Sequence, residues 1–445
     1  MPKRVVIIGG GAAGVSAAVA ARKKDFNAQI TVVSEESELA YSRCGMPFCL
    51  GGEIKNAEKL VLHDESFYSM MRIKYLVSTT ATGVDTASRK VKAKKGEQEK
   101  TLEYDSLVIA TGAKAFTPRI SGLDSAEVHY MRSLQDLRKL KKAAKKGKHA
   151  VVVGARYTGL EAAEALAARG VKVTVVDILP RILAGLFDKE LAEGVQARMQ
   201  KDGIQFVLGH EVEEVKNSHC FVGGKNLKAD FIVMAAGVRG NVSLAKEAGI
   251  ELGETGLIKV NALMQTSNPD VFSAGDCVEL THLLTREPAP MQLGSLAARG
   301  GEIAGANAAG DEKTMSRPLG AHVSRLFGLE VAGTGLTEEA ALSYGFRTVV
   351  QTVDAASRPH YFGSERVKVK LVSNESGRLL GAQVIGTGEA GWRINYLTQA
   401  IANGIGVGEV ARAEFSYCPP TADSLEPLQL AASALHRKIL LTTRD

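Results

Sequence analysis

The chain of 445 residues has few cysteines, few aromatic side chains and no long hydrophobic run. Its five cysteines are too scattered to form a disulfide framework, which favours a reducing compartment. No apolar stretch reaches the roughly 20 residues that a membrane-spanning helix needs. The first residues run directly into a strand-like segment, whereas a signal peptide has an apolar stretch before a cleavage site. We therefore expect a cytoplasmic protein without a membrane partner.

The chain also has only a small excess of positive over negative charge. The chain has 55 Lys and Arg residues against 49 Asp and Glu residues, a formal net charge of +6. Much of the excess lies at residues 138–148, without the interleaved aromatic side chains that single-strand binding requires. A solvated helix face between two domains is the favoured interpretation, so we expect no nucleic-acid partner. The length itself predicts two or three domains.

A glycine-rich turn at residues 9–14 lies within a strand–turn–helix–strand pattern whose second strand is expected at residues 29–33. In such a unit Gly9 makes the tight turn and Gly11 lets the backbone approach a pyrophosphate. Gly14 lets the helix pack closely on the strand. The free amides and dipole at the helix N-terminus favour the phosphates. These residues predict a dinucleotide-binding βαβ unit.

The acidic residue that binds the ribose in such units is displaced in this chain. Its usual position holds Ser34, and two glutamates follow directly. We assign the role to Glu35, although a shift of one residue reverses the direction of a side chain in a strand.

The same arrangement recurs at residues 150–177. Gly154 and Gly159 occupy the first and third glycine positions, and Asp177 ends the next strand. A carboxylate at that place bonds a ribose 2′-hydroxyl and repels a 2′-phosphate, so NADH is favoured over NADPH. Arg156 occupies the middle glycine position. Two outcomes stay open: its guanidinium pairs with phosphate, or it weakens nicotinamide nucleotide binding.

Two such fingerprints followed by residues 266–276 resemble the FAD-dependent pyridine nucleotide–disulfide oxidoreductases. Residues 104–112 and 229–241 are similar to further strands of that family next to the nucleotides. The resemblance implies an α/β fold with two Rossmann-like nucleotide-binding domains, for FAD and NAD, plus a C-terminal α+β dimerisation domain. The expected boundaries are an FAD-binding domain at 1–115 and 243–318, an NAD-binding domain at 116–242 and a dimerisation domain at 319–445.

The resemblance also implies further contacts to both nucleotides. Thr111 and Gly112 lie in the segment that returns to FAD, and Asp276 is expected to hold the flavin's ribityl hydroxyl. Tyr157 resembles the tyrosine that covers the flavin until nicotinamide displaces it. Glu161 resembles the acid beside the nicotinamide. Tyr157 and Glu161 also have purely structural interpretations: Tyr157 as a ring that packs under the turn, and Glu161 as a stabilising charge near a helix N-terminus.

A single cysteine, Cys44, lies in residues 41–48 (YSRCGMPF) directly after the second strand. This position resembles the single-cysteine branch of the family: coenzyme A-disulfide reductases, persulfide or polysulfide reductases, NADH oxidases and NADH peroxidases. Gly45 and Pro47 predict a chain turning into a helix. A thiol at a helix N-terminus, with Arg43 beside it, is expected to have a lowered pKa. We therefore predict that Cys44 is redox-active.

Other residues separate the possible chemistries. Cys44 and Cys49 have C-x4-C spacing, but residues five apart on a helix have Cα atoms about 8–9 Å apart. A disulfide needs roughly 4.4–6.8 Å, so Cys49 is expected to be a packing residue. Cys418 is interpreted as a loop cysteine, with a resolving role left open. Ala12 stands where oxidase and peroxidase members commonly have a histidine, which favours disulfide-type substrates.

The C-terminal third is similar to the coenzyme A-disulfide reductases at Tyr361 and Tyr417. In that family these tyrosines come from the partner subunit, which implies a homodimer with shared active sites. The expected substrate contacts are Arg22, Ser42 and Arg43. From about Leu435 onward the sequence has no interpretable pattern.

The predicted function is a flavoprotein reductase that passes electrons from NADH through FAD and Cys44 to a small disulfide, persulfide or polysulfide. Coenzyme A forms are favoured, with coenzyme A as substrate or as a mixed disulfide, and no metal is expected. The alternative is an NADH oxidase or peroxidase that uses Cys44 as a sulfenic acid. An electron-carrier reductase, which needs no cysteine, and a non-enzymatic redox sensor are less favoured alternatives.

Overall fold

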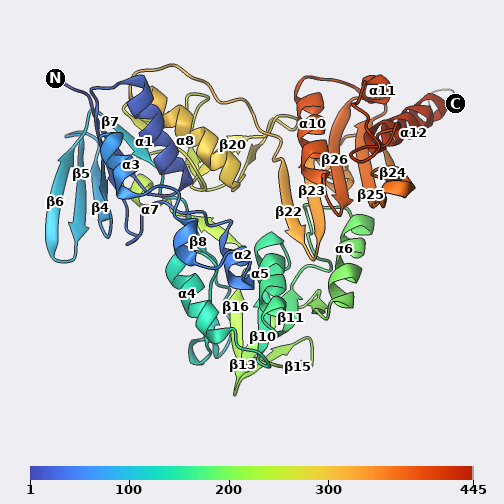
Figure 1. Ribbon diagram of the computed structural model, residues 1–445. Helices are drawn as coiled ribbons and strands as arrows, with labels where there is room; N and C mark the ends of the chain where they lie inside the picture. Colours follow the sequence, from blue (N-terminus) through green and yellow to red (C-terminus); the bar gives the residue numbers. More distant parts are fainter. Residues whose placement is uncertain (443–445) are drawn as a thin grey trace.

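The computed structural model describes residues 1–442, which form three lobes, each built on a five-stranded sheet (Figure 1). The first sheet is parallel and has the strand order β19-β7-β1-β2-β3. Its strands are nearly continuous apolar runs because helices or loops cover both faces. Their bounds are β1 (Arg4–Ile8), β2 (Gln29–Val33), β3 (Ile73–Leu76), β7 (Ser106–Ile109) and β19 (Val271–Ser273).

Two long helices lie side by side on this sheet, α1 (Ala12–Lys24) and α8 (Gly294–Ala308) (Figure 1). Their contact is made by backbone rather than by large side chains. A Cβ at Gly301 would lie 2.1 Å from the carbonyl oxygen of Ala13, and one at Gly305 would lie 2.0 Å from that of Ala17. The small residues are therefore required by the close approach.

Smaller elements complete the first lobe. An antiparallel sheet, β4-β5-β6, lies at its outer edge, and the short β18-β20-β21 sheet lies beside α8. The bounds are α3 (Glu65–Met70), β4 (Thr80–Asp85), β5 (Lys90–Lys95), β6 (Gln98–Glu103), α7 (Ser243–Glu247), β18 (Ile258–Lys259), β20 (Val278–Thr281) and β21 (Pro288–Ala289). The short helix α2 (Met46–Gly51) belongs to the first lobe in sequence but packs on the helices of the second lobe.

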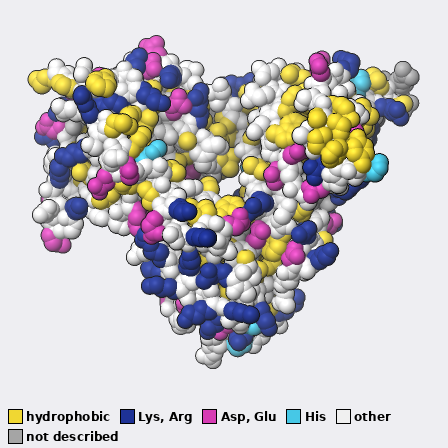
Figure 2. Space-filling model, in the orientation of Figure 1, with side chains coloured by type: hydrophobic (Ala, Val, Ile, Leu, Met, Phe, Trp, Pro, Cys, Tyr) yellow, Lys and Arg dark blue, Asp and Glu magenta, His cyan; other side chains and the backbone are white. Residues whose placement is uncertain are grey.

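The second lobe contains a parallel sheet of order β12-β11-β10-β16-β9. The chain enters and leaves this lobe through an antiparallel pair, β8 with β17. Figure 2 shows Lys and Arg side chains gathered over this lobe. The bounds are β8 (Ala113–Ala115), β9 (Val128–His129), α4 (Leu134–Ala143), β10 (His149–Val153), α5 (Tyr157–Ala168), β11 (Lys172–Asp177), α6 (Lys189–Lys201), β12 (Gln205–Leu208), β13 (Val212–Lys216), β14 (His219–Val222), β15 (Lys225–Lys228), β16 (Phe231–Met234) and β17 (Val238–Gly240).

The third lobe is an antiparallel sheet, β22-β23-β26-β25-β24, with helices packed against it. Residues 435–442 belong to α12, and Leu435 itself is buried, so this part of the tail packs in the core rather than lacking a pattern, while residues 443–445 lie outside the described residues. The bounds are β22 (His322–Leu326), β23 (Leu329–Gly335), α9 (Glu338–Ser343), β24 (Thr348–Ala356), β25 (Arg366–Asn374), β26 (Leu379–Gly386), α10 (Ala390–Ala402), α11 (Val407–Arg412) and α12 (Pro427–Thr442).

These sheets confirm the predicted fold class, with two parallel nucleotide-type sheets and one antiparallel α+β unit. The first sheet takes strands from both sides of the inserted second lobe, as a nested domain requires. Within residues 1–442 no helix has the combined length and apolarity to cross a bilayer.

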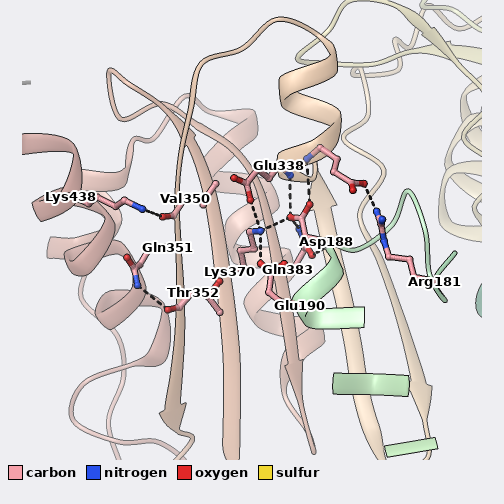
Figure 3. A network of polar contacts seen from close by, with 11 residues as sticks. Arg181, Asp188, Glu190, Glu338, Val350, Gln351, Thr352, Lys370, Gln383 and Lys438 are labelled. Carbon is pink, nitrogen blue, oxygen red and sulfur yellow. Dashed lines mark hydrogen bonds and ion pairs between the residues drawn. The ribbon is translucent and has the colours of Figure 1, made fainter. Parts of the chain in front are cut away.

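A buried polar network joins the second and third lobes (Figure 3). The Lys370 side chain, in β25, is 2% exposed, and its Nζ lies 3.0 Å from a carboxylate oxygen of Asp188, 2.6 Å from Glu190 and 2.7 Å from Glu338. Gln383 and Asp188 exchange two hydrogen bonds. Burial alone would lower the pKa of Lys370, but the carboxylates raise it above its ordinary value, so the ammonium stays charged.

Candidate active site

Cys44 lies in the turn that precedes α2, and it is exposed. Its Sγ lies 3.8 Å from the point that a Cβ on Gly294 would occupy, at the first turn of α8. Cys49 is buried inside α2, and both cysteines are free thiols. Within the described chain, the turn before α2 therefore presents one accessible sulfur, beside the start of a long helix.

The Cys44 thiol does not have the lowered pKa predicted from the sequence. Partial burial raises its pKa, and the carboxylates of Glu161 and Asp276 raise it further, while Arg132 and Arg43 oppose the change. That prediction was wrong because burial of the thiol and two carboxylates from distant segments outweigh the neighbouring arginines, of which Arg43 is itself paired with Glu36.

The first glycine turn has the geometry that a diphosphate needs. Gly9 has φ +114°, and a Cβ there would lie 2.0 Å from the carbonyl oxygen of Ala110. A Cβ on Gly14 would lie 1.9 Å from the oxygen of Gly9. Gly11 begins α1 without any side-chain cap, which leaves the helix amides available for an anion. These residues therefore fit the FAD diphosphate.

The segment after β7, which contains Thr111 and Gly112, lies next to the first glycine turn. The Thr111 hydroxyl donates to the carbonyl of Asn241 at 2.6 Å, and the Asn241 amide donates back to Thr111 at 3.0 Å. Gly112 adopts φ +65°, a left-handed conformation that favours glycine. Together they fasten the strand that returns from the second lobe next to the glycine turn.

Asp276 has a partner that the sequence did not reveal. Arg132 donates to its carboxylate at 3.3 Å and also to the carbonyl of Ala113 at 2.9 Å. Arg132 lies between two recognisable motifs, in a stretch without a pattern, so only the tertiary structure identifies it.

Glu35 is exposed, and the structure does not bring it to the glycine turn. The next residue, Glu36, contacts the site instead, through its ion pair with Arg43. Strand β2 ends at Val33, and the next residue, Ser34, is buried with its Oγ 2.7 Å from the point that a Cβ on Gly10 would occupy. Glu35 and Glu36 lie in the bend after the strand, so the alternation of a strand does not set the direction of either side chain.

The second glycine turn repeats the first. Gly154 has φ +115°, with a would-be Cβ 2.2 Å from the carbonyl oxygen of Ala235, and a Cβ on Gly159 would lie 1.9 Å from the oxygen of Gly154. Asp177 ends β11 and accepts the backbone N–H of Ala155 at 2.6 Å. Its carboxylate therefore stands directly beside the turn.

Arg156 begins α5 in the backbone conformation that Gly11 has at the start of α1. Their φ and ψ angles are −95° and −177° for Arg156 and −80° and −166° for Gly11. This extended conformation accepts any residue, so the arginine causes no backbone strain. Its Nη2 lies 3.4 Å from the point that a Cβ on Gly185 would occupy. The guanidinium of Arg156 therefore lies beside the segment that follows β11.

Tyr157 and Glu161 both extend from α5 toward the third lobe. The Tyr157 hydroxyl donates to the carbonyl of Val331 at 3.0 Å, so in this conformation it is held by β23. Glu161 accepts a hydrogen bond from the Ser324 hydroxyl at 2.6 Å. Burial raises the pKa of Glu161, and the Ser324 hydrogen bond opposes that rise.

Of the predicted substrate contacts, Arg22 does not fit the role. It is 5% exposed, and its guanidinium donates to backbone carbonyls of five residues: Asp25, Phe26, Ala28, Met71 and Arg72. Since every nitrogen of the guanidinium is engaged within the protein, none is available for a substrate phosphate. Ser42 accepts the N–H of Gly45 at 3.2 Å and so shapes the turn that carries Cys44.

Tyr361 and Tyr417 are neighbours on the third lobe, and they are 62% and 53% exposed. Partial desolvation and the nearby Tyr361 hydroxyl raise the pKa of Tyr417. Figure 2 shows hydrophobic side chains gathered on this lobe. Cys418 is also exposed and free.

Two lobes with dinucleotide-type glycine turns, and an accessible thiol beside the first, are the arrangement of a flavin-containing oxidoreductase that uses a pyridine nucleotide. The family model described as pyridine nucleotide-disulphide oxidoreductase matches residues 3–312, and that family's dimerisation domain matches residues 324–428. The chain belongs to this family, and its cofactors are FAD and a nicotinamide nucleotide.

Individual relatives are similar over nearly the whole chain. An NADH oxidase of Methanocaldococcus jannaschii is 37% identical and covers 98% of this chain and 99% of its own. An NAD(P)H coenzyme A polysulfide/persulfide reductase of Pyrococcus horikoshii is 32% identical, covering 98% and 99%. The structure of an NAD-dependent persulfide reductase from A. fulgidus has a TM-score of 0.95 and 33% identity, covering 98% of this chain and 83% of that one.

Proposed function

We propose that this chain reduces a small disulfide, persulfide or polysulfide with electrons from NADH, and that a coenzyme A form is the favoured substrate. The observation that supports this most is the exposed thiol of Cys44 beside the start of α8, with its neighbour Cys49 buried. The names of two relatives that match this chain over nearly its whole length support the substrate class.

Sulfur exchange at Cys44 is the chemical step that the chain's own residues carry. The Cys44 thiolate attacks one sulfur of the substrate R–S–S–R′, which forms Cys44–S–S–R and releases R′–S⁻. Two electrons and a proton then restore the Cys44 thiolate and release R–SH. FAD, when bound, supplies the route by which the electrons of NADH reach this mixed disulfide.

Because the protein's own groups raise the pKa of Cys44, the thiolate needs a proton acceptor or a cationic neighbour during turnover. Tyr361 and Tyr417, exposed and adjacent on the third lobe, fit a role in proton transfer to the departing thiolate if they reach the site of a second copy. We therefore propose a homodimer with shared active sites. Asp177 beside the second glycine turn supports NADH over NADPH.

Cys44→Ser tests this function. The variant should bind FAD and let NADH reduce it, but it should lose turnover with coenzyme A disulfide or polysulfide by at least about 1,000-fold, since the attacking sulfur is gone. Cys49→Ala is the matched control and should keep full turnover. Disulfide reduction that survives in Cys44→Ser would contradict the proposal.

A second candidate is an NADH oxidase, because the relative with 37% identity carries that name. Ala12 at the first glycine turn provides no hydrogen-bonding side chain for oxygen or peroxide chemistry. Oxygen consumption at saturating NADH, compared with the rate on coenzyme A disulfide, separates the two functions. A faster rate with oxygen and a sulfenic acid on Cys44 would favour the oxidase.

A further inference from the structure

Arg43, which directly precedes Cys44, connects three parts of the site. Its Nε donates to the carbonyl of Arg132 at 3.0 Å, and its Nη2 pairs with the carboxylate of Glu36. Its remaining nitrogen, Nη1, lies 3.0 Å from the point that a Cβ on Gly11 would occupy. Within residues 1–442 this third nitrogen makes no hydrogen bond.

The direction of Nη1 is the informative feature. Gly11 is the residue through which a βαβ unit lets its backbone approach a diphosphate. The 13-residue helix α1 begins there without a side-chain cap, so its free amides and its dipole face the same space. A guanidinium that enters this space adds an N–H donor to the free helix amides. A phosphate group accepts hydrogen bonds from both kinds of donor, and those from the charged guanidinium are strong.

The surrounding charges agree with an anion at this point. Arg43 and Arg132 bring two cations, and Glu36 and Asp276 each pair with one of them. The protein groups are therefore balanced before a ligand binds, and the helix N-terminus adds partial positive charge. What favours a diphosphate here is therefore the set of free donors, Arg43 Nη1 and the uncapped amides of α1, rather than a net positive charge of the side chains.

We propose that Arg43 binds the FAD diphosphate, rather than the substrate, and that FAD thereby holds the turn that presents Cys44. The guanidinium is fixed on two sides by Glu36 and the Arg132 carbonyl, and the diphosphate is its third partner. Cys44, the next residue, then takes its position from the bound cofactor. This role rests on FAD as the cofactor and does not depend on which sulfur substrate the protein reduces.

The test measures FAD binding to the apoprotein by flavin fluorescence. Arg43→Met should weaken FAD binding about 10- to 100-fold, which corresponds to the loss of a charge-assisted hydrogen bond. Arg43→Lys should be affected less because it keeps the charge. Arg138→Ala is the control variant, because Arg138 is an exposed arginine that pairs with Glu38. The affinity of this variant for FAD should equal that of the wild type.

Two probes separate the phosphate contact from a general loss of structure. Arg43→Met should weaken binding of ADP, which carries a diphosphate, and should leave binding of adenosine unchanged. Equal losses for both probes would overturn the proposal, because they would mean that the variant merely distorts the nucleotide site. If the apoprotein does not survive removal of FAD, the rate of FAD release from the purified holoenzyme gives the same comparison between variants.

The link to Cys44 has its own measurement. FAD should change the alkylation rate of Cys44 by iodoacetamide in the wild type, and this effect should be smaller in Arg43→Met at saturating FAD. Unchanged FAD and ADP affinities together with a raised KM for the disulfide substrate would overturn the proposal and return Arg43 to a substrate role. These measurements report binding of FAD and ADP, so they test the role of Arg43 even if the protein does not reduce a sulfur substrate.

Discussion

Lys370→Met removes the one ammonium that faces three carboxylates between the second and third lobes (Figure 3). Methionine keeps much of the length and volume of the lysine, so the change isolates the charge. The side chain of Asp188 is 4% exposed and would lose its cation while staying in a buried position. Removal of one member of a buried ion pair costs about 3–5 kcal/mol, because the remaining charge is left without compensation.

Asp188 keeps some partners in the variant, and this sets the expected magnitude. Gln383 donates to it at 2.5 Å, and the backbone N–H of Glu338 donates at 3.1 Å. These bonds retain part of the stabilisation, so we expect about 3 kcal/mol, the lower end of that range. At 1.4 kcal/mol per factor of ten, the population with the two lobes separated rises about 100-fold.

Denaturant unfolding, followed by flavin fluorescence and by circular dichroism, measures this effect. The protein has several lobes, so the two signals are analysed as separate transitions. Lys189→Met is the matched control, because its side chain is 74% exposed and lies 3.8 Å from Glu193. Such a surface pair contributes about 0–1 kcal/mol.

A double variant makes the reasoning sharper. Asp188→Asn removes the charge that Lys370→Met would leave buried, so the two changes together should cost less than the sum of the single changes. Additive costs, or a Lys370→Met variant as stable as Lys189→Met, would refute the view that this network holds the two lobes together.

Four further predictions concern the nucleotide sites and the first lobe. Arg156→Leu should raise the KM for NADH about three- to tenfold at low salt, because it keeps a Cβ at the turn but loses the cation; an unchanged KM would show that the guanidinium does not serve the phosphates. Arg22→Met should lower the melting temperature without changing the KM for coenzyme A disulfide, since its guanidinium contacts only backbone carbonyls; a raised KM with normal stability would restore its substrate role. Ser324→Ala should shift the acidic limb of the pH profile for flavin reduction by NADH to higher pH, because the lost hydroxyl stabilises ionised Glu161; an unmoved limb would mean that Glu161 does not titrate in this step. The folding stability that protonated Glu161 contributes should be complete below about pH 4, its usual pKa in an unfolded chain, and should decline as the pH rises through its raised pKa.

Local patterns predicted much of the fold. The strand expected at residues 29–33 is β2, and both glycine turns adopt the positive φ angles that their first glycines require. These features depend on short-range sterics and on hydrophobic patterning, which a single sequence displays directly. The alternation of strand and helix runs likewise led to the two parallel sheets.

The errors concern long side chains whose partners lie far away in the sequence. Arg22 is at the end of a helix, where a phosphate contact is reasonable, yet it reaches carbonyls near residue 72. Arg132 and Lys370 have no motif around them. The pKa of Cys44 depends on carboxylates from two other segments, Glu161 and Asp276. Local spacing cannot rank such distant contacts, so these features emerge only from the folded chain.

The backbone contact between α1 and α8 has a consequence for electron transfer. Helices that touch through glycine and alanine have no flexible side chains between them to absorb a displacement, so they resist sliding and rocking. Helix α1 begins at the first glycine turn, and α8 begins next to Cys44. The separation between the glycine turn and the Cys44 sulfur is therefore fixed by a stiff contact between two helices, which is what electron transfer from a flavin held at that turn would require.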